Sequence, residues 1–330
     1  MTKILQKTYK AFIGGQQVLE GISQSRQFSQ VDDLDKYIDK SNNSLNTFIL
    51  QDYQVTFDIK TDTKKNLNRG TFTFFNLQDD IVDYVANNIK KNTVFLFEAG
   101  FETDDVLRSI MKGTVVDYKD SKVGVDRKTT IYVEDGKVAA TECYANFSFV
   151  IGQTYADVVV RCSKAMGLSY SVSNFEVADT VLKAPVYIYG NVLDDLDLWL
   201  RGLDVPHHAF ILNHVLYVFP VWKAPQTNVN SVISITPESG LKGSPAFVSQ
   251  PVGISSDSSD DDKQPKFIQV TCSLNTGLQV GDNFYLESNT LAQKGIYHAT
   301  SINYKGNLED NDKWDSIIIA AFVESAIRAT

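Results

Sequence analysis

The chain has 330 residues, of which 43% are hydrophobic and 22% are charged, and its formal net charge is -9. This composition excludes a disordered chain and indicates two to four domains. Because phosphate binding needs clustered Lys and Arg, a chain this acidic is not expected to grip nucleic acid over a broad surface. A mildly acidic wall could instead let DNA slide past without binding.

The cysteines and the first residues indicate where the protein is made. Cys143, Cys162 and Cys272 are widely separated and lack C-x-x-C spacing. We therefore interpret them as reduced, buried residues that act as small hydrophobic side chains, in a protein made in a reducing cytoplasm. The first residues lack the apolar core of a signal peptide, and no run of 18 apolar residues occurs. We therefore expect neither classical export nor a membrane-spanning segment.

Residues 1–45 are polar and weakly patterned, so we expect an N-terminal arm or a partly ordered strand pair followed by a linker. The first compact domain is expected over 46–150, and it opens with two alternating strands. Since side chains on a strand point to opposite faces in turn, the pattern predicts one apolar and one wet face. The apolar set is Tyr53, Val55, Phe57, Ile59, Phe72 and Phe74, and the polar set is Gln54, Thr56, Asp58, Lys60, Thr71 and Thr73.

The rest of this first domain predicts a small antiparallel barrel with one flanking helix. Asp79 or Asp80 could cap the helix, whose apolar stripe is Ile81, Val85 and Ile89. Asp135-Gly136 favours a tight turn that would join the last two strands as a hairpin. The strands after the helix are expected at 94–98, 113–118, 129–134 and 142–149.

A small α+β middle domain is expected over 151–231. Thr154 and Asp157 have the spacing of a capping box, and the helix that follows should end at Gly167. A short strand is predicted at 172–177.

The middle domain should also contain a second helix and a hairpin. The helix starts near Asn191, and its first turn would hold acidic residues that interact favourably with the helix dipole. Strands at 210–212 and 215–219 flank Asn213-His214, which predicts a two-residue turn. The acidic residues are Asp194, Asp195 and Asp197.

Residues 232–330 are expected to be all-β again, as a second barrel. The acidic, low-complexity segment 255–263 is interpreted as a surface loop between strands. The spacing of the other strands resembles that of the first barrel, although no strict sequence repeat exists. These strands are expected at 266–273, 283–287, 295–304 and 316–323.

The sequence contains no constellation that predicts catalysis, a cofactor or a metal site. His207, His208 and His214 are the histidine cluster, but adjacent residues on an extended chain point to opposite faces, so we expect a solvent-exposed loop beside the hairpin. The run Asp260–Asp262 lacks the register of a calcium loop. No nucleophile elbow, zinc-protease motif or phosphate-binding loop occurs.

Tyr187 and Tyr189 alternate on a strand before Gly190, and Trp222 lies beyond the hairpin. They could form an aromatic platform for a sugar. Aromatic residues on strands are more often part of a core, so this remains an alternative.

Several short motifs, in their order along the chain, resemble the central hub proteins of contractile-tailed phage baseplates. The strand-to-helix step Thr71–Leu77 and the strand Val94–Phe101 are similar to steps in that family, as is Lys112–Val115. Further matches are Gly152-x-Thr154 leading to Gly167-Leu168, then Ser239–Pro245, Leu278–Ser288 and Gly295–Tyr297. Together they span most of residues 50–323.

This resemblance implies a non-enzymatic virion protein that forms a homotrimeric ring, with no cofactor. Each subunit would supply two tail-tube-like barrels and a small α+β domain, adapting a hexameric tail tube to a trimeric spike. Partners would be the tail tube protein, the spike, wedge or other baseplate proteins, and DNA passing without specific binding. Assembly would take place in the host cytoplasm, and the residues expected to face the channel are Gln54, Thr56, Asp58, Thr71 and Thr73.

Three alternatives remain open at the level of sequence. The chain could be a tail module that binds cell wall or sugar through the middle domain, or a tail-associated hydrolase. It could also be the trunk of a type VI secretion spike, which shares the hub architecture.

Overall fold

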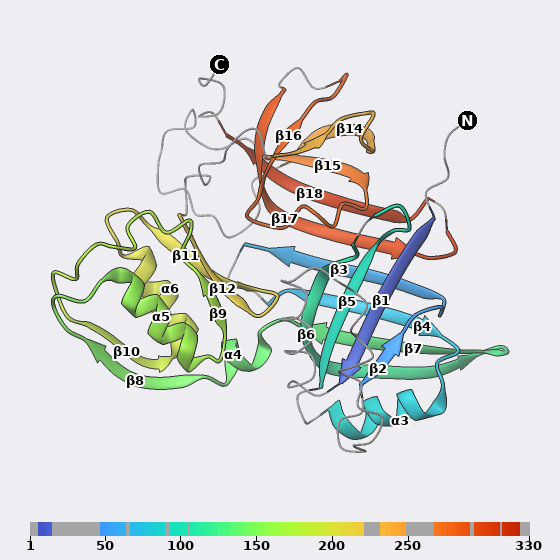
Figure 1. Cartoon of the computed structure of the whole chain (residues 1–330), viewed down its shortest axis with the longest axis horizontal. Coiled ribbons are helices and arrows are strands. Elements are labelled where there is room, and N and C mark those ends of the chain that lie inside the picture. The colour runs from blue at the N-terminus through green and yellow to red at the C-terminus, as the bar shows by residue number, and fades with distance from the viewer. Residues whose placement is uncertain are drawn as a thin grey trace. The chain divides into compact units, whose positions relative to one another are not determined.

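The computed structural model describes residues 6–14, 47–63, 67–89, 93–104, 106–220, 232–248, 267–290, 294–310 and 312–323. They form two compact units, each built mainly from β-strands (Figure 1). Unit 1 comprises 1–59, 67–137 and 306–314, and unit 2 comprises 60–66, 138–305 and 315–330. The expected mainly β fold with short helices is confirmed.

The described part of unit 1 is a largely antiparallel sheet with helix α3 (Asp79–Asn88). Its strands lie in the order β3-β4-β7-β6-β5-β1-β2. They are β1 (Lys7–Gly14), β2 (Phe48–Leu50), β3 (Val55–Asp62, of which the part up to Ile59 belongs to unit 1), β4 (Arg69–Phe75), β5 (Val94–Phe101), β6 (Arg108–Val123) and β7 (Asp126–Glu134).

An aromatic core shows that this sheet curls over itself. The ring of Phe72 on β4 lies 4.5 Å from that of Phe95 and 4.7 Å from that of Phe97 on β5, although β7 and β6 separate the two strands in the sheet. Phe57 on β3 reaches Phe97 as well, at 4.9 Å between centroids. β2, at the end of this strand order, does not pair with β3, so the described strands make an open, curled sheet and not a closed barrel.

A distant segment, residues 306–314, completes the core of unit 1. The indole Nε1 of Trp314 donates a hydrogen bond to the carbonyl oxygen of Gly100 (3.2 Å), and its ring meets Phe57 edge-on at 5.0 Å. Gly306 passes so close that a Cβ there would lie 2.7 Å from Trp314 Cε3. Only glycine lets the chain approach these rings without displacing them.

For Lys7–Gly14 the sequence left open an arm or a partly ordered strand pair, and this segment is strand β1, which lies between β5 and β2. The start of the helix differs from the sequence-based expectation. Helix α3 begins after Gln78 with no side-chain cap, so neither Asp79 nor Asp80 is its N-cap residue. Packing of its apolar stripe fixes this helix, because Ile81, Val82 and Val85 are buried.

The hairpin predicted around Asp135-Gly136 is wrong. The turn forms, with Gly136 at φ +66°, but it leads into α4 (Lys137–Thr141). The next strand, β8 (Tyr144–Phe149), pairs with β10 (Val186–Asn191) instead of β7. The reason is that β4 and β6 already occupy both edges of β7.

Unit 2 contains the middle region, where the predicted helix caps are found. Thr154 Oγ1 accepts a hydrogen bond from the Asp157 amide (3.2 Å), and the Asp157 carboxylate accepts one from the Thr154 amide (2.8 Å), so the capping box of α5 (Tyr155–Ala165) is confirmed. Asn191 caps α6 (Val192–Arg201) through the Asp194 amide. Gly167, at φ +67°, follows the end of α5.

The hairpin of β11 (His207–Leu212) and β12 (Val215–Pro220) is also confirmed. Asn213 and His214 both have positive φ, at 52° and 66°, as a two-residue hairpin turn with matching twist requires. β12 pairs in parallel with β9 (Ser169–Ser171). One apolar core joins α5 and α6 to the β8–β10 pair and to this second small sheet.

The strand predicted at 172–177 is wrong, because this segment forms turns. The amide of Phe175 donates to Val172 O (3.0 Å), and the amide of Ala178 donates to Phe175 O (2.9 Å). These bonds direct Phe175 into the core, where it is 2% exposed.

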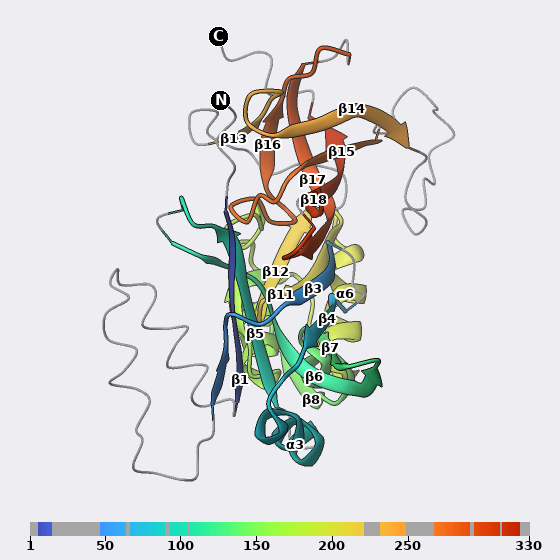
Figure 2. The ribbon, with the colours of Figure 1, turned by 90° about the vertical axis from the view of Figure 1, so that its right-hand side faces the viewer.

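The remaining strands of unit 2 form a sheet in the order β14-β15-β18-β17-β16-β13. Edge strand β14 runs along β15 (Figure 2). The strands are β13 (Ile233–Ile235), β14 (Leu241–Val248), β15 (Phe267–Ser273), β16 (Asn283–Leu286), β17 (Gly295–Asn307) and β18 (Trp314–Phe322). The acidic segment 255–263, with Asp260–Asp262, lies outside the described residues, as does Trp222.

Candidate functional site

The alternating polar face predicted on β3 and β4 is present in unit 1. All members of the apolar set on these strands are buried, whereas Gln54, Thr56 and Thr71 are half-buried and Asp58 is exposed. Thr73 differs from the expectation, since it is only 8% exposed and its hydroxyl shares a hydrogen bond with Thr130 Oγ1 (3.0 Å). It packs on the neighbouring strand and is not open to solvent in this chain.

The same face continues across β7 and β6, which sequence reasoning did not include. Tyr132 stands opposite Thr71 on one side and opposite Asp117 on the other, and directly opposed residues share a face. Lys119 stands opposite Thr130 in the same way. The alternation of Lys128, Thr130 and Tyr132 along the sequence could have predicted that β7 contributes to this face.

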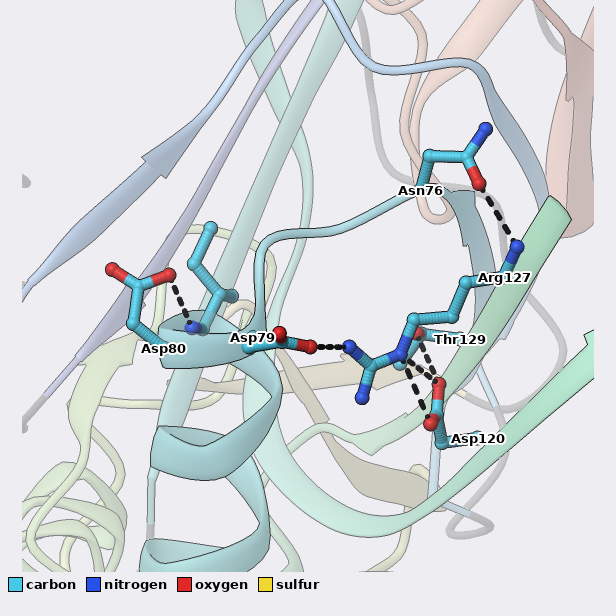
Figure 3. A network of polar contacts seen from close by, with 7 residues as sticks. Asn76, Asp79, Asp80, Asp120, Arg127 and Thr129 are labelled. Atoms are coloured by element: carbon cyan, nitrogen blue, oxygen red, sulfur yellow. Dashed lines mark hydrogen bonds and ion pairs between the residues drawn. The ribbon is translucent and has the colours of Figure 1, made fainter.

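A polar network ties the β6–β7 hairpin to the start of α3 (Figure 3). Arg127 Nε donates to both carboxylate oxygens of Asp120 at 3.0 Å, and its guanidinium also pairs with Asp79. Asn76 Oδ1 accepts from the Arg127 amide (2.9 Å), and Thr129 Oγ1 donates to Asp120 (2.8 Å).

This network stabilises the charged form of the Asp120 carboxyl. The hydrogen bond from Arg127 lowers the pKa of the Asp120 carboxyl. Beyond it the hairpin projects from the sheet (Figure 1), and its tip exposes Val123 (61%) and Val125 (92%). These contacts can stiffen the projecting β6–β7 hairpin, and the Arg127 and Asp120 side chains are engaged with each other.

The histidines do not form the exposed loop expected from the sequence. His207 is fully buried on β11, with Nδ1 2.7 Å from the Val205 carbonyl oxygen and its ring edge-on to Phe175. Burial lowers the pKa of His207 and lowers that of His208 to about 4. The charge of His208 also lowers the pKa of His298 on β17.

Asp197 was expected beside Asp194 and Asp195 at the helix dipole, but it has a different role. It is 5% exposed on the inner side of α6. Its carboxylate accepts hydrogen bonds from Arg201 Nε (2.8 Å) and from the Ala209 amide (3.1 Å). It therefore joins α6 to β11, a tertiary contact that its sequence position could not show.

The aromatic residues Tyr187 and Tyr189 are exposed on β10, at 70% and 76%. They are not part of the core, and both line a pocket of about 530 Å³. This settles the orientation that the sequence left open for these two residues.

The described residues place limits on other kinds of site. Within the described ranges, no group of three or more His, Cys, Asp or Glu side chains is arranged to hold a metal ion. Cys143, Cys162 and Cys272 are free thiols. No helix in the part of the chain that the structure describes is long and apolar enough to cross a membrane.

Comparison with known proteins gives matches through structure alone. No protein-family model matches the sequence, and a search of the curated proteins gives no match. The fold is similar to a 43 kDa tail protein of prophage MuSo2 from Shewanella oneidensis, with TM-score 0.54 and 10% identity over 83% of this chain and 93% of that one. A tail protein from Neisseria meningitidis MC58 matches with TM-score 0.54 and 10% identity, over 83% and 94% of the two chains. The chain has the fold of phage tail proteins.

A secretion protein shares this phage-tail fold. The E. coli c3393 protein, described as a type VI secretion component similar to the T4 tail proteins gp27 and gp5, matches with TM-score 0.52 and 11% identity. The match covers 82% of this chain and 74% of that one. At such identities the likeness establishes the fold, so the function has to be argued separately.

Proposed function

We propose that this protein is a structural, non-enzymatic component of a phage tail baseplate, and within it the central hub ring between tail tube and spike. The observation that carries the proposal is the fold match to two phage tail proteins over 83% of this chain and more than nine-tenths of theirs. The order of hub-like sequence motifs supports the same function independently. The protein would then reside in the virion after assembly in the host cytoplasm, with tube, spike and other baseplate proteins as partners.

The two sheets suit a symmetry adaptor. Each unit contains a broad, largely antiparallel sheet, so three copies in a closed ring would present six such sheets to a hexameric tube. In this arrangement each sheet would act as one tail-tube-like barrel. Closure would be completed between neighbouring subunits, since the described strands leave the sheets open.

The polar face of β3 and β4 is the part proposed to line the channel. Gln54, Thr56, Asp58 and Thr71 offer neutral or acidic groups, which attract DNA phosphates weakly or repel them, while Lys60 and Lys119 on the same face are basic. Thr73 would support the wall through Thr130 and would not meet the lumen.

Edge strand β14 is the proposed site of subunit contact. It pairs with β15 on one side and ends the strand order on the other, and Phe247 on it is 63% exposed. An open edge with an exposed aromatic residue favours pairing with another chain.

The test is the mass of the purified protein in solution over a range of concentrations. We expect a concentration-dependent trimer of about three times 36.8 kDa, which Phe247→Ser weakens by about tenfold or more. Tyr187→Ser is the matched control, because it removes a similarly exposed aromatic residue from a strand of unit 2 and should leave the trimer intact. A wild-type protein that stays monomeric at all concentrations would contradict the hub.

The trunk of a type VI secretion spike is the alternative that the fold also supports, through the E. coli c3393 match. Neighbouring genes separate the two functions. Genes for a tail sheath, tube and capsid favour the phage hub, and genes for a secretion apparatus without a capsid favour the spike trunk.

A further inference from the structure

Unit 2 contains a pocket beside the free edge of β10 that the hub function does not use. Its volume is about 530 Å³, and its walls come from the segment 182–187, from β10 and from one side of α5 and α6. The side chains that carry the argument are Tyr155, Tyr187, Tyr189, Asp195 and Trp199. Pockets of this size with aromatic walls and a few polar groups are typical of small-ligand sites.

The aromatic residues at this pocket are arranged for contact with a ligand. Tyr187 and Tyr189 are alternate residues of β10, so both rings stand on the same face, where they are 70% and 76% exposed. Trp199 meets Tyr155 edge-on, with 5.3 Å between centroids and 81° between planes, which fixes the two inner rings. Four aromatic residues therefore line the pocket, two of them held by packing and two with exposed side chains on the outer face of β10.

Polar groups lie beside these rings. Asp195 Oδ2 accepts a hydrogen bond from the Tyr189 amide (2.7 Å), which holds the carboxylate at the pocket wall. Across the strand pair, exposed Ser148 and Asn146 stand opposite Tyr187 and Tyr189 on the same face. A hydroxyl and an amide group thus flank the exposed tyrosines on the outer face, and a carboxylate lies at the pocket wall.

The charge of the pocket favours a neutral ligand. Asp195 and Lys183 are the ionisable acid and base among its lining residues, and their charges balance. A phosphate or carboxylate ligand would meet the Asp195 carboxylate, while a simple hydrocarbon would leave that carboxylate desolvated without a partner.

We infer that this pocket binds a neutral oligosaccharide. A sugar ring presents C–H groups that pack on an aromatic face and hydroxyls that donate to acceptors, and this pocket offers both. A proline-rich peptide also fits aromatic grooves, but it lacks N–H donors at its prolines and presents carbonyl oxygens, which do not match the Asp195 carboxylate. The site goes beyond the hub function and does not depend on it, since all its residues lie within one chain.

The experiment titrates the purified full-length protein with neutral trisaccharides and with a decaproline peptide, using calorimetry and tryptophan fluorescence. The trisaccharides are chitotriose, cellotriose and maltotriose. We expect at least one of them to bind with a dissociation constant on the order of 1 mM, and Tyr187→Ala and Tyr189→Ala each to weaken it by about tenfold. Asp195→Asn keeps an acceptor for the Tyr189 amide but should weaken binding through the lost charge.

Tyr170→Ala is the matched control, because Tyr170 is an exposed tyrosine on the other small sheet and does not line the pocket. It should bind as the wild type does. Failure of all three trisaccharides to bind at about 10 mM would overturn the inference. Equal affinity in the pocket variants, or binding of decaproline alone at Tyr187 and Tyr189, would overturn it as well.

Discussion

His208 and His298 are side chains whose protonation depends on the fold. Burial lowers the pKa of each to about 4, and the charge of His208 lowers the pKa of His298 further. His208 also lies near Asp197 and Arg201, whose charges act on it in opposite directions. His298 Nδ1 is 2.9 Å from Asn283 Oδ1. Both histidines are therefore neutral in the folded protein near neutral pH.

These pKa shifts predict acid sensitivity. A histidine with a folded pKa of about 4 and an ordinary value of 6.5 binds its proton more readily in the unfolded chain, so stability is full above pH 6.5 and falls as the pH drops toward 4. We expect a loss on the order of 1 kcal/mol per histidine between pH 7 and pH 5, measured by urea unfolding. His298→Gln should reduce this pH dependence, and an unchanged dependence would contradict the assignment.

At the scale of elements, the β6–β7 hairpin has a brace that joins its two strands to each other and to α3. Arg127 joins the hairpin to Asp79 on α3 and to Asp120 across the strand pair. Partly exposed ion pairs contribute little to global stability, typically about 1 kcal/mol or less, so the brace acts mainly on local order.

Replacing Arg127 with Met should therefore loosen the hairpin without unfolding the protein. We expect faster amide hydrogen exchange at the hairpin and at the first turn of α3, with exchange in β1 and β5 unchanged. Lys128→Met, at an exposed neighbouring position, is the control and should leave exchange as in the wild type. Equal exchange in both variants would show that the network does not order the hairpin.

At the scale of the whole molecule, the proposed channel makes a prediction about DNA. Asp58 is exposed on the polar face of β3, so Asp58→Lys should preserve assembly while adding a cation to the wall. In assembled particles we expect slower DNA release at low salt and recovery at higher salt, because salt screens the new attraction.

The control for this experiment is Asp83→Lys, which makes the same charge change at an exposed position of α3. It should release DNA at the wild-type rate. If Asp58→Lys also releases DNA at that rate at low salt, β3 does not line the channel.

The sequence by itself determined the features that depend on neighbours along the chain. The capping box at Thr154, the hairpin turn at Asn213-His214 and the alternation on β3 each need only a few adjacent residues, and each is found in the structure. Local hydrogen bonds and side-chain periodicity are sufficient to specify them.

Only the tertiary structure decided which distant segments meet. Both edges of β7 are already paired, so β8 pairs with β10 instead. Trp314, which is far from Phe57 in the sequence, packs against its ring. Trp199 and Asp195 line the same pocket as Tyr187 and Tyr189. The sequence predicted that they lie on a helix, but not that this helix lies beside β10. Strand pairing and pockets depend on which edges and faces remain free after folding, and that is a property of the whole unit.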